Sequence, residues 1–157
     1  MISIRTSVNG MAHSSVVPAR LTVAEYLRDE LGLTGTKTSC ELEVCGVCSV
    51  LVGDLPVSAC TALAAELDGR EVTTVEGLAD GSDLSPLQQA FIDTFATQCG
   101  FCTPGFLIMA TSLLKTNPDP SAEEVADYLD GNICRCTGYR PIIEAVLLAA
   151  EMMRTGP

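Results

Sequence analysis

The residues of this chain best suited to bind metal are its eight cysteines, which fall into two sets of four. The gaps within the first set are four, two and eleven residues, for Cys40, Cys45, Cys48 and Cys60. This order is the plant-type arrangement of thiolate ligands around a [2Fe-2S] cluster. A loop that supplies three thiolates must wrap around the cluster, with the fourth arriving from a later strand. The first set therefore predicts a [2Fe-2S] site.

The second set consists of two close pairs that lie far apart in the sequence: Cys99 with Cys102, and Cys134 with Cys136. Four thiolates also bind zinc tetrahedrally, commonly as two closely spaced pairs. The four-residue first gap of the first set fits zinc less well. The spacing of the second set, taken alone, leaves zinc and an iron-sulfur cluster both open.

Composition and charge limit the class of protein. The chain has 157 residues, 47% of them hydrophobic, with nine basic and twenty acidic side chains and a net charge of -11. That charge opposes binding to nucleic acid and to anionic membrane surfaces. The N-terminus lacks the pattern of a secretion signal, and no apolar run is long enough for a membrane span. We expect a cytoplasmic protein whose cysteines bind metal rather than pair as disulfides.

The elements around the first cysteine set are predicted to form a small mixed sheet with one helix. Alternating apolar residues on either side of Asn9-Gly10 indicate a hairpin. Thr22 and Glu25 form a capping box that opens a helix, which Gly32 ends. We expect strands at 2–8, 13–17, 49–52, 56–59 and 71–75.

The elements around the second set are predicted to be four helices. A polar, glycine-containing stretch at 79–84 separates a domain at 1–78 from a domain at 85–157. Leu87, Phe91 and Phe95 recur at helical spacing and are expected in the core. We expect helices at 86–96, from 103 through 114, from a capping box at 121–124, and at 141–153.

Short connections in a four-helix bundle place the first and third turns at the same end. Cys99 and Cys102 lie in the first of these turns, and Cys134 and Cys136 lie in the third. We therefore expect the four thiols of the second set to converge. The helices that start at 103 and 141 would aim their N-terminal dipoles at that anionic site.

Two longer motifs surround the second set. They are Gln98-Cys99-Gly100-Phe101-Cys102-Thr103-Pro104-Gly105 and Gly131-Asn132-Ile133-Cys134-Arg135-Cys136-Thr137-Gly138-Tyr139-Arg140-Pro141. Together with the spacing of the first set, they closely resemble the iron-sulfur subunit of molybdenum hydroxylases, over essentially the whole chain. The resemblance implies an α+β chain. Its N-terminal part would be a β-grasp [2Fe-2S] ferredoxin-like domain, followed by a C-terminal four-helix [2Fe-2S]-binding domain.

The resemblance also implies cofactors and partners. All eight cysteines would ligate two [2Fe-2S] clusters, the second near a molybdopterin-type molybdenum cofactor on a large subunit and the first near FAD on a medium subunit. Gln98 would contact the pterin cofactor. The chain would relay single electrons, hold no catalytic residue and be inactive alone, within a heterotrimer or a dimer of heterotrimers. A free-standing two-cluster electron carrier is the alternative.

The segment 41–44 departs from this pattern, because the family's first loop is usually glycine-rich between its first two ligands. Here that segment contains Glu41 and Glu43 and no glycine. Non-glycine residues resist positive φ angles, and two carboxylates add negative charge. We expect the four cysteines still to bind a cluster. We expect the hydrogen bonding around it and its reduction potential to differ from those of other family members.

Overall fold

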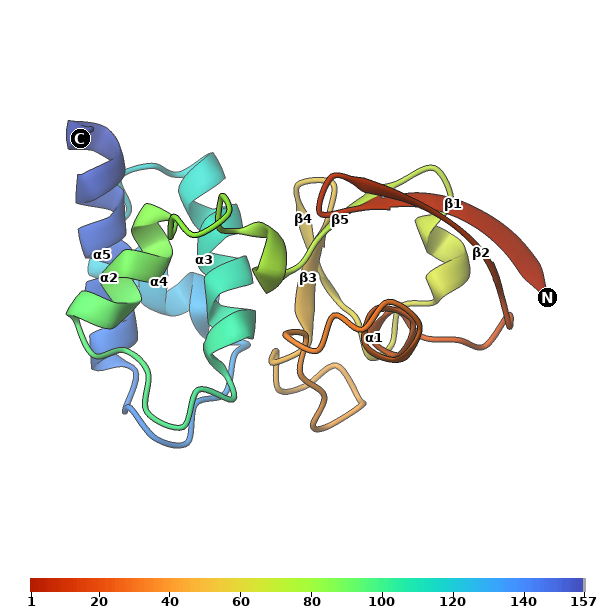
Figure 1. The fold of residues 1–157 in the computed structure, drawn as a ribbon. Coiled ribbons are helices and arrows are strands. Elements are labelled where there is room, and N and C mark those ends of the chain that lie inside the picture. Colours follow the sequence, from red (N-terminus) through yellow and green to blue (C-terminus); the bar gives the residue numbers. More distant parts are fainter. Residues whose placement is uncertain (157) are drawn as a thin grey trace.

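The computed structural model describes residues 1–156, which form two halves lying side by side (Figure 1). A β-sheet with short helical segments makes up the N-terminal half, and a group of α-helices makes up the helical half. The N-terminus and the C-terminus lie at opposite far ends of the molecule (Figure 1). None of the helices described combines the length and the apolar run that crossing a membrane requires.

The N-terminal half is built on a five-stranded sheet in the order β2-β1-β5-β3-β4. Its strands are β1 (Ile2–Val8), β2 (Met11–Val17), β3 (Ser49–Val52), β4 (Leu55–Ser58) and β5 (Glu71–Thr73). β1 runs parallel to β5 and antiparallel to β2, while β3 is antiparallel to both β4 and β5. The short helical segments of this half are α1 (Val23–Glu25), η1 (Tyr26–Glu30), η2 (Ala64–Leu67) and η3 (Val75–Gly77). This mixed sheet is the β-grasp architecture that the resemblance implied.

The predicted first hairpin is confirmed, since Val8 pairs with Met11 across the turn. Asn9 and Gly10 both have positive φ, which matches the two-residue turn whose twist suits a hairpin. The capping box is also present, because the Thr22 side chain accepts from the backbone of Glu25 and the Glu25 carboxylate accepts in return. It starts a helix whose Tyr26 is fully buried against the sheet.

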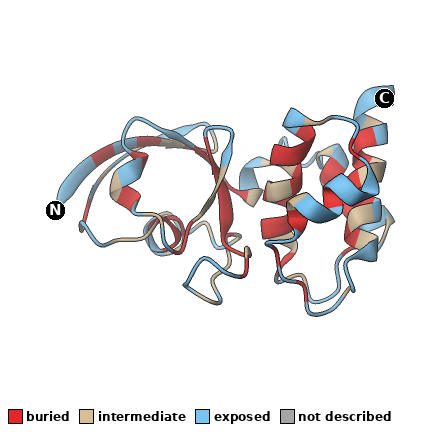
Figure 2. Ribbon diagram, turned by 180° about the vertical axis from the view of Figure 1, so that it is seen from behind, coloured by how far each residue is buried: buried red, intermediate tan, exposed pale blue. Residues whose placement is uncertain are grey.

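The helical half contains four helices, as predicted. They are α2 (Pro86–Asp93), α3 (Thr103–Thr116), α4 (Ala122–Leu129) and α5 (Arg140–Thr155). Capping boxes at Ser85 and Ser121 start α2 and α4, and prolines lie in the first turns of α2, α3 and α5. Buried residues face inward, while the connections at one end of the helices are largely exposed (Figure 2).

One predicted helix boundary is wrong, and with it the placement of Phe95. α2 ends at Asp93, and Phe95 has a φ of 54° and an exposed fraction of 83%. The Thr94 hydroxyl and backbone N–H both donate to the carbonyl of Ala90, which closes the last turn. The chain then turns outward, so Phe95 is a surface residue rather than a core residue.

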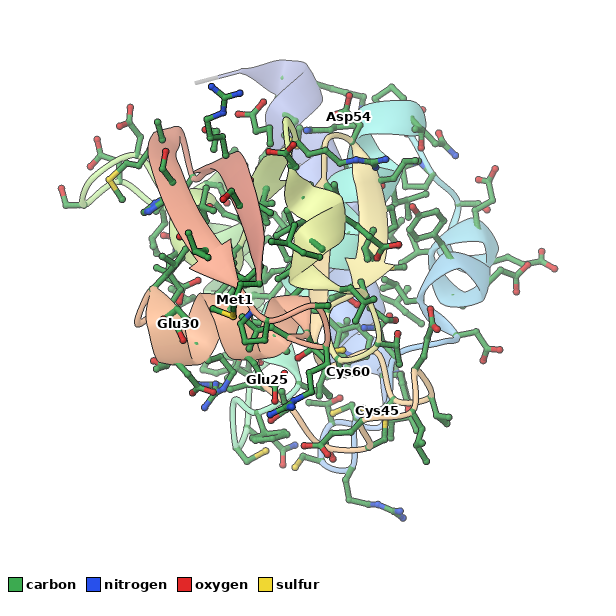
Figure 3. All side chains as sticks on the ribbon, turned by 90° about the vertical axis from the view of Figure 1, so that its right-hand side faces the viewer. Met1, Glu25, Glu30, Cys45, Asp54 and Cys60 are labelled. Carbon is green, nitrogen blue, oxygen red and sulfur yellow. The ribbon has the colours of Figure 1, made fainter. Side chains whose placement is uncertain are left out.

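The two halves contact each other through α3, which packs against β3 and β4. Lys115 forms an ion pair of 2.9 Å with Asp54, and the Ser112 hydroxyl donates to the Asp54 carbonyl. Asp54 lies in the turn between β3 and β4. Figure 3 shows it at the opposite end of the molecule from Cys45 and Cys60. The halves therefore meet along the length of α3.

Candidate metal centres

The first cysteine set lies at one end of the sheet, where the loop before β3 meets the segment after β4. Cys45, Cys48 and Cys60 are buried, and Cys40 is partly buried. Figure 3 shows Cys45 and Cys60 near each other on that side. The thiols lie close enough to shift one another's pKa, since Cys45 acts on Cys40 while Cys60 and Cys45 both act on Cys48.

The loop between Cys40 and Cys45 adopts the conformation that glycines would favour, although it contains none. Glu41 and Glu43 have φ angles of 54° and 59°. These angles turn the backbone N–H groups of Leu42 and Val44 toward the Cys40 sulfur, and each lies 3.4 Å from it. Backbone N–H groups that converge on one point in this way form a concave anion site. They lower the pKa of the Cys40 thiol to about 6.

One buried thiol in each set has a raised pKa instead. Burial, together with the neighbouring Cys60 thiol, raises the pKa of Cys48 to about 12. Burial likewise raises the pKa of Cys102 to about 12, with Cys134 contributing. A buried thiolate needs a positive partner, and a metal ion supplies one and binds the deprotonated form. This donor chemistry fits metal ligation at both sets.

The second set occupies the connections between α2 and α3 and between α4 and α5, which lie at the same end of the helical half (Figure 1). The Cys136 and Cys99 sulfurs are 3.5 Å apart, and the Cys134 thiol lies near enough to Cys102 to raise its pKa. The structure thus brings together the four thiols that the turn order predicted to converge. The outer pair is exposed and the inner pair is buried.

Residues 137 and 139 support the buried Cys134. The Thr137 backbone N–H lies 3.4 Å from the Cys134 sulfur, and its hydroxyl lies 3.2 Å from it. Burial opposes ionisation of Cys134, but these two groups, together with the Cys136 backbone and the Cys102 thiol, outweigh it, so the pKa of Cys134 is lowered. The Tyr139 hydroxyl accepts from the Cys134 N–H at 3.0 Å, and the Tyr139 ring packs edge-on against Phe106.

The donor sets admit either a two-iron cluster or a single metal ion. A [2Fe-2S] cluster takes four thiolates, two at each iron, whereas zinc takes all four around one centre. The 3.5 Å separation of the Cys99 and Cys136 sulfurs would suit two ligands of the same iron or of the same ion.

The two sites are joined by direct hydrogen bonds between their loops. The backbone N–H of Ile133 donates to the carbonyl of Cys45 at 2.9 Å. The side-chain amide of Asn132 donates to the carbonyl of Gly46 at 2.9 Å. Because Ile133 precedes Cys134 directly, a ligand-bearing segment of one half contacts a ligand-bearing segment of the other.

Sequence reasoning placed Gln98 beside the second set but assigned no role to Asn132 or Tyr139. Gln98 is exposed directly before Cys99, where a partner molecule can reach it. Tyr139 lies in the longer motif around Cys134 and Cys136. Only the fold shows that it adopts a φ of 69°, which is uncommon for a residue other than glycine. Asn132 is an asparagine two residues before a ligand, with an exposed fraction of 2%. Its place next to the ligand segment was the only sequence feature that could have indicated a role for Asn132.

Each half matches a described protein family. Residues 6–79 match the family described as a 2Fe-2S iron-sulfur cluster binding domain, and residues 74–147 match the family described as a [2Fe-2S] binding domain. The two matches together cover both cysteine sets. They support a [2Fe-2S] cluster, rather than zinc, at each set.

Three similar proteins cover nearly the whole chain. The nicotine 6-hydroxylase small subunit of Paenarthrobacter nicotinovorans is 53% identical over 93% of this chain and 88% of its own length. In the quinoline 2-oxidoreductase of Pseudomonas putida 86, one chain is 44% identical with a TM-score of 0.94, over 99% of this chain and 97% of that one. The aldehyde oxidoreductase of Desulfovibrio desulfuricans is 41% identical with a TM-score of 0.95, but this chain spans 17% of it.

Proposed function

This chain belongs to the family of iron-sulfur small subunits of molybdenum hydroxylases, and we propose on that premise that it links a molybdopterin-bearing large subunit to an FAD-bearing medium subunit. It is an electron-transfer subunit of an oxidoreductase complex and carries two [2Fe-2S] clusters. Substrate oxidation belongs to the molybdenum-bearing partner in this proposal. The residues of this chain hold and connect the clusters.

The proposed ligands are the two cysteine sets, one for each half. Cys40 and Cys45 would hold one iron of the first cluster, and Cys48 and Cys60 the other, as the effects of Cys45 on the pKa of Cys40 and of Cys60 on the pKa of Cys48 suggest. In the second cluster the iron pairs would be Cys99 with Cys136 and Cys102 with Cys134. Each [2Fe-2S] cluster supplies a one-electron carrier when bound. We propose domain limits of 1–78 and 85–157, with a linker at 79–84.

The proposed electron relay is supported chiefly by the hydrogen bond between the Ile133 N–H and the Cys45 carbonyl. It connects the backbone of a first-set ligand to the residue that precedes Cys134, a second-set ligand. The connection is short because the loops touch directly, with no helix or side-chain layer between them. Two one-electron carriers joined in this way can pass the electron pair of a substrate oxidation one electron at a time.

The surfaces around the two sets suggest where the partners bind. Leu42 and Val44 on the first ligand loop are 74% and 62% exposed, which is unusual for aliphatic side chains beside a charged site. We propose that they contact the FAD-bearing subunit. Phe95 and Gln98 are exposed beside the second set, and we propose that they contact the molybdenum-bearing subunit. Gln98 would hydrogen-bond the pterin.

The assembly would be a heterotrimer or a dimer of heterotrimers. In the aldehyde oxidoreductase of Desulfovibrio desulfuricans, the matching region is one part of a longer chain, so close association with further domains occurs in a relative. We also propose a cytoplasmic location, since eight unpaired cysteines suit a reducing compartment.

The iron content of the isolated chain tests the cluster assignment. We expect about four iron and about four acid-labile sulfides per chain, and a visible spectrum that dithionite bleaches. Cys48→Ser should remove one EPR signal of the reduced protein, and Cys134→Ser should remove the other, because each half holds its own ligands. Stoichiometric zinc without visible absorption would contradict the assignment. Loss of both signals in either folded variant would contradict the proposed ligand sets.

A further inference from the structure

We propose that Asn132, Gly46 and Gly105 form a loop clamp that sets the separation of the two clusters and thereby the rate of electron exchange between them. This inference rests on the proposed ligand sets. The clamp joins one residue of the first ligand loop, one of the second ligand loop and one of the first turn of α3. These three residues ligate nothing, so the clamp acts by positioning.

Asn132 provides the polar part of the clamp. Its side chain is almost fully buried, at 2% exposure, and its amide Nδ2 donates to the Gly46 carbonyl at 2.9 Å. Its backbone N–H donates to the carbonyl of Leu129, which fixes Asn132 to the end of α4. A buried amide donor without an acceptor destabilises the folded protein. The hydrogen bond therefore strongly favours the arrangement in which the two loops touch.

The two glycines provide the close approach of the backbones. A Cβ atom on Gly46 would lie 2.7 Å from Nδ2 of Asn132, and its φ of 68° disfavours any side chain. A Cβ atom on Gly105 would lie 2.5 Å from the Gly46 carbonyl oxygen and 3.0 Å from Cα of Val47. Backbone atoms cannot yield as a flexible side chain can. A methyl group at position 105 must therefore push the first ligand loop away from α3.

The clamp lies directly beside the hydrogen bond that links the two ligand sets. Gly46 follows Cys45, and Asn132 precedes Ile133, whose N–H donates to the Cys45 carbonyl. A movement of Gly46 away from Asn132 would thus lengthen that bond and move Cys45 relative to Cys134. Electron tunnelling and the magnetic coupling of two reduced clusters both decrease steeply with distance. Both should respond to the clamp.

The test compares Asn132→Asp and Gly105→Ala with the unaltered full-length chain, all loaded with clusters. Asn132→Asp keeps the size of the side chain but replaces the donor with a carboxylate that repels the Gly46 carbonyl. We expect each variant to show a weaker spin–spin interaction in the EPR spectrum of the fully reduced protein. We also expect a several-fold slower exchange of an electron between the clusters after flash reduction.

Lys115→Met is the matched control, because it breaks another contact between the same two halves. The ion pair of Lys115 with Asp54 lies at the end of the molecule away from Cys45 and Cys60 (Figure 3). The spin–spin interaction and the exchange rate should stay unchanged in this variant. A loss equal to that in Asn132→Asp would show that general loosening of the halves, and not the clamp, is responsible, and would overturn the proposal.

Iron content separates the possible failures. An unaltered chain without two clusters would refute the proposed ligand sets before any variant is compared. Unchanged coupling and exchange in a fully loaded Asn132→Asp protein would overturn the clamp while leaving the ligand sets intact. If Gly105→Ala fails to bind both clusters, the milder Asn132→Asp and Asn132→Ala variants decide the question.

Discussion

At the scale of single residues, the first ligand loop reaches a glycine-like conformation through two glutamates. Left-handed φ angles cost a non-glycine residue roughly 1 kcal/mol or more. Glu41 and Glu43 both adopt them, and as a result two backbone N–H groups point at the Cys40 sulfur. The Glu43 carboxylate also accepts from the hydroxyl of Thr61, next to Cys60. The loop thus directs two N–H groups at the Cys40 sulfur and places negative charge beside the site.

Substitution of Glu43 should separate the effect of charge from that of backbone strain. Glu43→Gln removes the charge at a left-handed position, and Glu43→Gly also relieves the strain. Both should raise the midpoint potential of the first cluster by roughly 30 mV, which corresponds to about a threefold change in the equilibrium constant for its reduction. Redox titration followed by EPR measures this.

The same titration in a Cys134→Ser background, which should lack the second cluster, assigns the shift to the first site. An unchanged potential in Glu43→Gln would show that the carboxylate is screened by solvent. Higher stability of Glu43→Gly than of Glu43→Gln would measure the backbone strain directly.

At the scale of elements, three capping boxes start the helices that carry or support the sites. In α4, the helix that precedes Asn132, the Ser121 hydroxyl accepts from the Glu124 backbone and the Glu124 carboxylate accepts from the Ser121 N–H. The Ser121 N–H has the larger effect and the Ser121 hydroxyl a smaller one, and together they hold the pKa of Glu124 below its ordinary value of 4.5. The carboxylate is therefore charged and stabilising at neutral pH.

Loss of this cap should destabilise the helical half. We expect Ser121→Ala to lower the free energy of unfolding by about 1 kcal/mol, as measured by denaturant titration. A carboxyl group with a lowered pKa stabilises the fold above its unfolded pKa, and this contribution is lost as pH falls through the folded pKa. The stability difference between the unaltered chain and Glu124→Gln should thus stay constant from about pH 6 to about pH 8. A difference that changes across that range would point to another titrating group.

At the scale of the whole molecule, two halves with separate ligand sets are held in one fixed relation. α3 packs along β3 and β4, and the ligand loops hydrogen-bond at one end of this contact. A relay requires such a relation, because electrons must cross between the halves without dissociation.

In the assembled enzyme, Cys134→Ser should leave substrate binding largely intact but block reduction of FAD by substrate. The first step from the molybdenum centre would be missing, whereas direct reduction of FAD by dithionite should persist. Stopped-flow absorbance of the flavin measures both reactions. Rapid flavin reduction by substrate in an assembled variant that lacks the second cluster would mean that electrons bypass the helical half.

The sequence by itself determined the cysteine sets, the two halves and most element boundaries. Ligand spacing, capping boxes and the Asn9-Gly10 turn depend on residues close together in the chain, so local chemistry is sufficient to predict them. The family resemblance added the cluster type of the second set and the electron-transfer role. Phe95 was misplaced because helical spacing alone does not show where a helix ends.

Only the tertiary structure decided which thiols contact each other and how the halves meet. Asn132 and Gly46 are far apart in sequence, and their hydrogen bond forms because α3 and the end of α4 pack against the first ligand loop. The positive φ angles of Glu41 and Glu43 likewise oppose local preference and persist because the surrounding fold imposes them. Contacts of this kind depend on packing between distant segments, and no local pattern encodes them.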